Sequence, residues 1–291
     1  MHPAPSVILF TTLSGLGFGM LFWLGLGFPS VTGWVAFIFF AIAYLLSVGG
    51  LIASTTHLGH PERAWRAFSQ WRSSWLSREG CAAVAALLLM ALHGAGLVFI
   101  GTHWGLAGAL GALLSLATVF TTSMIYTQLK SVPRWNQPST PVLFLSLSLG
   151  GGALLTGQIP AAALLLAVAG TTQLWHWHTG DSALASSGTT AETATGLGTI
   201  GKVRHMAPPH TGPNYLLKEM VHVVARKHAQ KLRVIGFTTM IALPLLLLIL
   251  FPASHGLAAI AILTHLTGVL TTRWLFFAEA EHVVGIYYGA R

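Results

Sequence analysis

Two titratable residues, His57 and Glu79, lie at the two ends of one charged segment that joins two apolar runs. A histidine side chain titrates at about pH 6.5 and can both donate and accept hydrogen bonds. A carboxyl group can hold or release a proton. If the apolar runs are antiparallel membrane helices, their adjoining ends bring the two residues to the same side of the bilayer. These residue types at these positions predict proton transfer at a membrane boundary.

Both residues also have ordinary structural explanations. An interfacial histidine can serve only as a lipid headgroup contact. Glu79 could pair with Arg78, or place a negative charge at a helix N-terminus, where the helix dipole favours it. Arg63 and Arg78 are further candidates for the site, because a guanidinium group at either position could orient a ligand carbonyl or close the site.

The elements that must position these residues are membrane helices. Of the 291 residues, 54% are hydrophobic and only 8% are charged, a composition that excludes a soluble globular domain. Each apolar run is long enough to cross a hydrocarbon core of about 30 Å as a helix and too continuous for barrel strands. The sequence therefore predicts an all-α bundle of eight transmembrane helices, at 7–28, 33–56, 80–100, 105–128, 141–157, 160–177, 234–251 and 256–278.

The basic residues fall on one side of this topology. All 15 Lys and Arg residues lie between runs two and three, four and five, or six and seven, or at the C-terminal end. By the positive-inside rule, both termini and the loops 57–79, 129–140 and 179–233 are expected to be cytoplasmic. The residues 1–291 then form one membrane-anchor domain. Because the positive charge is confined to loops beside the spans, lipid headgroups explain it, and we expect no nucleic-acid partner.

Several local features refine this topology. Trp65, Phe68, Trp71 and Trp75 recur at helical spacing in the first basic loop, which predicts a short interfacial helix. Pro244 is expected to kink the seventh span, and the glycines at 150–152 are expected to allow close helix packing. The single cysteine, Cys81, excludes a disulfide within the chain and a cysteine-ligated iron–sulfur cluster.

The loop 179–233 is too long and polar for a tight turn. Its first part is rich in Gly, Ser and Thr, as irregular structure is, and apolar residues recur at helical spacing after Pro213. Such a surface suits a docked partner, although a solvated basic loop would have the same composition.

Four segments resemble those of a known family: HLGHPERAWRAFSQWRSSWLSREG (57–80), YTQLKSVPRWNQPSTP (126–141), TAETATGLG (190–198) and PPHTGPNYLLKEM (208–220). Together they resemble the dimethyl sulfoxide reductase anchor-subunit (DmsC) family along essentially the whole chain. Within that family they are most similar to the membrane subunits of cytoplasmic sulfite dehydrogenases. The resemblance implies a subunit of the bacterial inner membrane, partnered on the cytoplasmic side by a four-cluster, ferredoxin-like iron–sulfur subunit and a molybdopterin catalytic subunit.

The resemblance also implies a quinone as the ligand, either ubiquinone or menaquinone. In the family, the histidine of the HLG motif and the glutamate that opens the third span are the quinol-site residues, and here these are His57 and Glu79. The implied function is electron transfer between the iron–sulfur subunit and the quinone pool, with sulfite as the expected electron source. A dimethyl sulfoxide reductase-type anchor would run the same transfer in reverse and oxidise menaquinol.

Two other classes of protein remain as alternatives. A haem b cytochrome would need two histidines at matched depth, for which His93 and His265 are the candidates, although interhelical hydrogen bonds are the ordinary role of such residues. A secondary transporter would show internal repeats and ionisable residues at mid-span. No convincing repeat is found in the sequence, and no Asp, Glu or Lys lies in the middle of a run. Arg273, the deepest fixed charge, is expected to reach towards Glu279 and Glu281.

Overall fold

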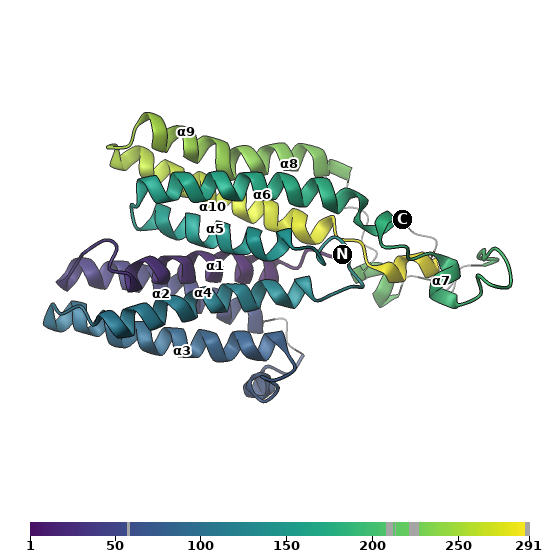
Figure 1. Cartoon of the computed structure of the whole chain (residues 1–291), viewed down its shortest axis with the longest axis horizontal. Helices are drawn as coiled ribbons and strands as arrows, with labels where there is room; N and C mark the ends of the chain where they lie inside the picture. The colour runs from purple at the N-terminus through teal and green to yellow at the C-terminus, as the bar shows by residue number, and fades with distance from the viewer. Residues whose placement is uncertain (57–58, 208–211, 213, 221–226, 289–291) are drawn as a thin grey trace.

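The computed structural model describes residues 1–56, 59–207, 212, 214–220 and 227–288, and throughout these residues the regular structure is helical, without strands. Figure 1 shows the helices running roughly parallel along the long axis of the molecule. The all-α prediction is therefore confirmed for this part of the chain. The main helices are α1 (Pro5–Gly25), α2 (Gly33–Thr55), α3 (Trp75–Ala95), α4 (Gly105–Thr127), α5 (Ser139–Leu155), α6 (Ile159–Ser186), α8 (Ala229–Phe237), α9 (Leu243–Leu250) and α10 (His255–Ala278).

Shorter helical segments complete the described structure. They are η1 (Pro61–Phe68), the π-turn η2 (Gly96–Ile100) that extends α3, α7 (Ala191–Thr195), η3 (Leu216–Met220), the π-turn η5 (Thr238–Ala242) between α8 and α9, and η6 (Val283–Tyr288). The segment η1 forms part of the short helix predicted for the first basic loop, and Trp65 and Phe68 are exposed on it. Trp71 is also exposed but lies in the turn that follows η1. Trp75 instead begins α3 and packs edge-on against Phe120.

Among the described residues, seven helical segments are long and apolar enough to cross a membrane. The eighth apolar helix, α5, has 17 residues and is shorter than the roughly 20 residues that a perpendicular crossing needs. Hydropathy located every one of these helices but not their ends. The helix α3 begins before the predicted position 80, and α6 continues to Ser186, beyond the predicted end at 177. Hydropathy marks the hydrocarbon layer, whereas a helix can continue into the polar region because its backbone hydrogen bonds are internal.

The helix α1 joins two groups of helices. In Figure 1, α1–α4 lie on one side of the molecule, and α5, α6 and α8–α10 lie on the other. The helix α1 packs against α2 and α4 in its own group and against α5 in the other. At one close approach of α1 and α5, a Cβ atom built on Gly152 would lie 2.2 Å from the carbonyl carbon of Gly19, so neither position has room for a side chain. This confirms the close packing predicted for the glycines of the fifth span.

Pro244 interrupts the backbone hydrogen bonds of the seventh span. Proline has no N–H group, so the carbonyl of Met240, four residues earlier, loses its helical hydrogen bond. The π-turn η5 lies directly before this point, as π-turns do where a helix ladder is disturbed. The carbonyl oxygen of Met240 instead lies 2.7 Å from Nδ1 of His265 in α10. An interhelical hydrogen bond thus replaces the one that Pro244 removes.

The basic connections and the ends of the described chain gather at one end of the bundle, as Figure 1 shows. The Met1 amino group donates to the carbonyl of Ala280 at 2.7 Å, and Tyr287 Oη donates to the carbonyl of Ala194 at 2.8 Å. These contacts tie the N-terminus, the C-terminal segment and the long loop together. The connections at the opposite end, 26–32, 101–104, 156–158 and 251–254, contain no Lys, Arg, Asp or Glu. We call the first end the basic end.

Candidate functional site

Glu79 lies inside the first turns of α3 at the basic end of the bundle. Its side chain shares a buried stripe of the helix with Ala83, Ala86, Met90 and His93, which recur at the period of a helix face packed against other helices. The residue is only 3% exposed. The sequence placed Glu79 at the boundary of the third span, so the early start of α3 buries this carboxyl group more deeply than expected.

The hydroxyl of Thr122 in α4 is the hydrogen-bond partner of Glu79. Thr122 Oγ1 contacts Glu79 Oε1 and also lies 2.9 Å from the carbonyl oxygen of Thr118, one turn earlier in α4. The pairing depends on how α3 packs along α4, and α3 and α4 form one of the most extensive helix contacts of the bundle. The sequence could not show this pairing because the two residues are 43 positions apart.

The other predicted site residues have different surroundings. His57 lies outside the described residues. Arg63 is exposed, and its Nε lies 3.7 Å from Glu62 Oε1. Arg78 does not pair with Glu79 in the described contacts, because its Nε and Nη2 donate to the carbonyls of Trp71 and Arg72 at 3.0 and 2.7 Å. The Arg78 guanidinium also lies 4.3 Å from the centre of the Trp75 ring.

The first basic loop is fastened to the start of α3. Ser77 Oγ donates to the carbonyl of Ala67 at the end of η1. A Cβ atom built on Gly80 would lie 3.2 Å from the Phe68 ring, so Gly80 lets this aromatic side chain pack over the helix beside Glu79. The loop therefore forms a partly aromatic cover next to the buried carboxyl group.

His93 and His265, the candidates for haem ligation, contact different helices. His93 lies near the end of α3, where Nδ1 is 3.2 Å from the carbonyl oxygen of Trp104 and the ring packs against Phe40 and His103. His265 lies in the middle of α10 and bonds to Met240, as described above. These contacts give both histidines a role in helix packing.

Arg273 is buried in α10 with an aromatic partner. Its guanidinium carbon lies 3.5 Å from the centre of the Phe144 ring, and the residue is 4% exposed. The expected approach to Glu279 is wrong, because Glu279 pairs with Arg233 at 2.7 Å and faces Arg134 at 3.7 Å. Because Arg134 and Arg233 already contact Glu279, Arg273 packs against Phe144 inside the bundle instead.

Two small cavities adjoin the Arg273 side chain. The first, here called the hydroxyl cavity, has a volume of about 20 Å³. Its lining includes Thr12, Ser14, Thr122, Ser148 and Arg273. The second, here called the histidine cavity, has a volume of about 10 Å³. Its lining includes Arg134, Gln173, His176, Arg273 and Glu279. Arg273 and Leu147 line both cavities. Sequence reasoning missed them, because their one sign was the frequency of Thr and Ser inside the apolar runs.

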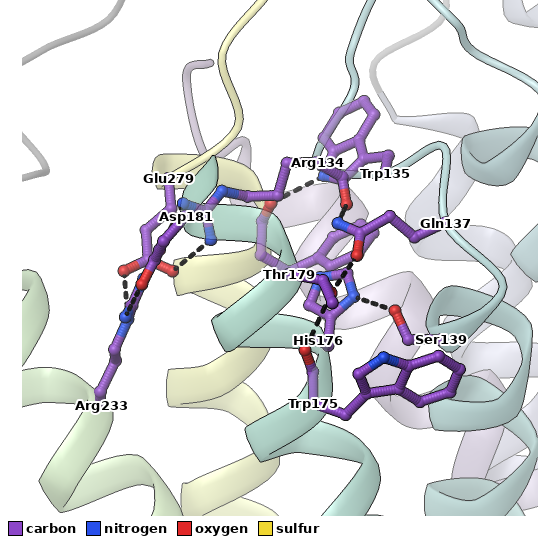
Figure 2. Close-up of polar contacts among 11 residues, drawn as sticks. Arg134, Trp135, Gln137, Ser139, Trp175, His176, Thr179, Asp181, Arg233 and Glu279 are labelled. Atoms are coloured by element: carbon purple, nitrogen blue, oxygen red, sulfur yellow. Dashed lines mark hydrogen bonds and ion pairs between the residues drawn. The ribbon is translucent and has the colours of Figure 1, made fainter. Parts of the chain in front are cut away.

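A cluster of charges lies beside the histidine cavity, because Arg134 and Glu279 line that cavity. Figure 2 shows the contacts of these residues. Arg233 donates to both oxygens of Asp181, at 2.8 and 2.6 Å, and to Glu279 at 2.7 Å. Arg134 donates to Asp181 Oδ1 at 2.6 Å. The four residues come from the 129–140 connection, α6, α8 and the end of α10, so they fasten these elements together. We call them the charge cluster. Beside it, Ser139 Oγ lies 3.0 Å from Nδ1 of His176.

The long loop has its own local order. Thr190 caps α7 in a reciprocal capping box with Thr193, with N–O distances of 3.3 and 2.8 Å. Glu192 accepts a hydrogen bond from the Val203 backbone N–H at 3.2 Å. Hydrogen bonds from its own backbone and from Thr190 hold the pKa of the Glu192 carboxyl below its ordinary value. The TAETATGLG segment is therefore a structured element on the basic end.

A bundle of apolar helices with one basic end and a structured polar loop on that end fits a membrane anchor subunit. Residues 2–279 match the DMSO reductase anchor subunit (DmsC) family, and the chain belongs to this family. It is 32% identical to a sulfite dehydrogenase subunit from Allochromatium vinosum, over 99% of this chain and 99% of that protein. No solved structure matches the chain.

Proposed function

We propose that this protein is the quinone-reactive anchor of a molybdopterin oxidoreductase complex. Its family membership supports the role of anchor, and the observation that carries the quinone site is the burial of Glu79 at the basic end, beneath the loop that begins at His57. An isolated carboxyl group is costly to bury in a membrane helix, so such residues mark functional sites. The similarity to a sulfite dehydrogenase subunit favours sulfite as the electron source.

The proposed topology has eight transmembrane helices with the basic end in the cytoplasm. The supporting observations are the gathering of both described chain ends at one end and the uncharged connections at the other. The shorter α5 still crosses in this proposal, because it packs against α1 and α6 and therefore meets lipid over only part of its surface. In a bacterium, this orientation corresponds to the inner membrane.

The proposed chemistry divides between the chain and its partners. A quinone takes up two electrons and two protons, and the electrons come from an iron–sulfur partner because one cysteine cannot ligate a cluster. Glu79 passes protons to the quinone, and His57, at the other end of the same loop, is proposed to share this role. Arg63 and Arg78 are proposed to orient a quinone carbonyl or to close the site. With a quinol-oxidising partner the same residues act in reverse.

The partners are proposed to dock on the basic end. The loop of α7 is ordered and is tied to the C-terminal segment by the Tyr287 hydrogen bond, so it offers a defined surface. The Arg residues of the first basic loop, of which Arg63, Arg66 and Arg72 are exposed, add positive charge to that surface. A four-cluster iron–sulfur subunit with acidic or polar groups facing this end would bring its last cluster towards Glu79 and would connect to a molybdopterin catalytic subunit.

The test is a Glu79→Gln variant in the assembled complex. We expect quinone-linked turnover to fall by about 100-fold or more, because the amide cannot exchange a proton, while turnover with a soluble dye is unchanged. Glu62→Gln is the matched control, since Glu62 belongs to the same loop but its side chain is 63% exposed. Normal quinone turnover in an assembled Glu79→Gln complex would contradict the proposal.

A further inference from the structure

The segment η1 presents three different rows of side chains. In a 3₁₀ helix, which has three residues per turn, side chains three positions apart lie above one another. The small row of η1 is half-buried, whereas the aromatic row and the basic row are both exposed. The rows are Ala64 with Ala67 (small), Trp65 with Phe68 (aromatic) and Arg63 with Arg66 (basic).

The aromatic row lies on the side of α3 that faces lipid. Exposed apolar side chains follow this side of α3 at intervals of four or eight residues: Leu76, Val84, Leu88 and Leu92. Gly80 occupies the open place in that series, and the Phe68 ring lies over it, since a Cβ atom on Gly80 would be 3.2 Å from the ring. Gly80 is also the first residue of the third apolar run, so Phe68 lies at the boundary of the hydrocarbon layer.

Two exposed guanidinium groups lie beside tryptophan rings in this loop. The guanidinium carbon of Arg66 is 5.5 Å from the centre of the Trp65 ring, and that of Arg72 is 5.3 Å from the centre of the Trp71 ring. Neither arginine forms an ion pair within the described ranges, where Glu62 contacts His60 and Arg63 instead. Tryptophan rings favour headgroup depth in a bilayer, so the adjacent N–H groups are held at the level of the lipid phosphates.

The axis of η1 crosses the direction of the membrane helices. In Figure 1 the turns of η1 are seen nearly end-on beside the basic end of α3, while the long helices run across the picture. Within the described ranges, η1 packs mainly against α3. The α7 segment, where soluble partners are proposed to dock, lies further out from the end of the bundle in the same view. The segment η1 therefore lies along the membrane surface at the side of the bundle.

From this geometry we infer that η1 and the turn after it form a binding site for an anionic phospholipid, with the phosphate on Arg66 and Arg72 and the aromatic row in the boundary below it. A guanidinium group can donate two parallel hydrogen bonds to a phosphate. Charge selects the lipid, because residues 61–78 contain four Arg and one Glu, a net charge of +3. The site does not depend on the quinone role proposed above.

Binding at this site fastens the loop that covers Glu79. On its inner side the loop is tied to α3 by the hydrogen bond from Ser77 to the carbonyl of Ala67 and by the packing of Phe68 over Gly80. A phosphate on the outer side holds the segment 62–73 between the lipid and α3. The backbone of this segment should therefore open less often when anionic lipid is present, and its amide hydrogens should exchange more slowly.

Hydrogen exchange of the assembled complex, followed by mass spectrometry, measures this effect directly. We compare nanodiscs of phosphatidylcholine with nanodiscs that also contain phosphatidylglycerol, and expect residues 62–73 to exchange about tenfold more slowly in the second. Arg66→Gln with Arg72→Gln should abolish the difference, because glutamine carries no charge, whereas Arg66→Lys with Arg72→Lys should keep most of it. The matched control, Lys202→Gln with Arg204→Gln, removes two exposed positive charges from the long loop and should keep the full difference.

Three results would overturn the inference. Equal exchange of residues 62–73 in the two kinds of nanodisc would refute the lipid site; slow exchange in both would mean that a soluble partner covers η1, and fast exchange in both that nothing does. An effect of phosphatidylglycerol that survives in the glutamine double variant would place the lipid elsewhere. Slower exchange on adding soluble glycerol phosphate to the phosphatidylcholine nanodiscs would show that the site takes a free anion and not a lipid.

Discussion

The carboxyl group of Glu79 combines two properties that a proton donor to a quinone needs. It is buried against α4, away from most solvent, and its hydrogen-bond partner Thr122 can either donate to it or accept from it. Arg78, its sequence neighbour, is held by loop carbonyls and by Trp75, so it does not neutralise the carboxylate in the described contacts. In the proposed quinone site, Glu79 could therefore gain or lose a proton without breaking an ion pair with Arg78.

His57 and Glu79 are expected to show coupled effects when both are changed. If His57 and Glu79 act in the same proton-transfer step, His57→Ala and Glu79→Gln should each lower quinone-linked turnover by about 100-fold, and the double variant should lose little more. The measurement is steady-state turnover of the assembled complexes with quinone and, separately, with a soluble dye. If the fold-loss of the double variant equals the product of the two single fold-losses, the residues act in separate steps.

Among the elements, the seventh span shows how a local defect is corrected by a distant residue. Pro244 removes the helical partner of the Met240 carbonyl, and His265 in α10 supplies another. Gly268 makes the close approach possible, because a Cβ atom built there would lie 2.2 Å from the Met240 nitrogen. The π-turn, the proline, the glycine and the histidine thus form one packing unit.

This unit predicts a rescue. His265→Ala leaves the Met240 carbonyl without its partner and should lower the free energy of unfolding by about 1 kcal/mol or somewhat more. Adding Pro244→Ala restores a backbone N–H four residues after Met240 and should recover part of that loss. The melting temperatures of the four proteins in detergent give the coupling. Strictly additive effects would show that the histidine and the proline are not linked through this carbonyl.

The elements also show what the sequence could and could not predict. Eight apolar runs predicted the helices because hydropathy follows the solvent around each segment. The predicted start of α3 and the predicted end of α6 were wrong, because the hydrogen bonds within a helix continue past the hydrocarbon layer. Glu79 could be singled out as a lone acidic residue at the edge of an apolar run. Thr122 and the surroundings of Arg273 could not, because only the packing of α3, α4, α1, α5 and α10 brings them together.

For the whole molecule, the two ends differ in charge. The basic end carries the charge cluster, the capped α7 segment and the buried Glu79, while the connections at the other end are short and contain no Lys, Arg, Asp or Glu. A subunit of the DMSO reductase anchor family with this polarity would receive its soluble partners and its quinone at the same end. The distance that electrons travel would then be short, and protons would come from the same side.

The most direct test of this account is photoaffinity labelling of the assembled complex with an azido-quinone, followed by mass spectrometry of the labelled peptides. We predict labelling within 57–83 and in the part of α4 around Thr122, and we predict that an excess of unmodified quinone prevents it. Labelling that quinone prevents but that lies only at the uncharged end, around His93 and the 101–104 connection, would contradict the assignment of the quinone site to Glu79.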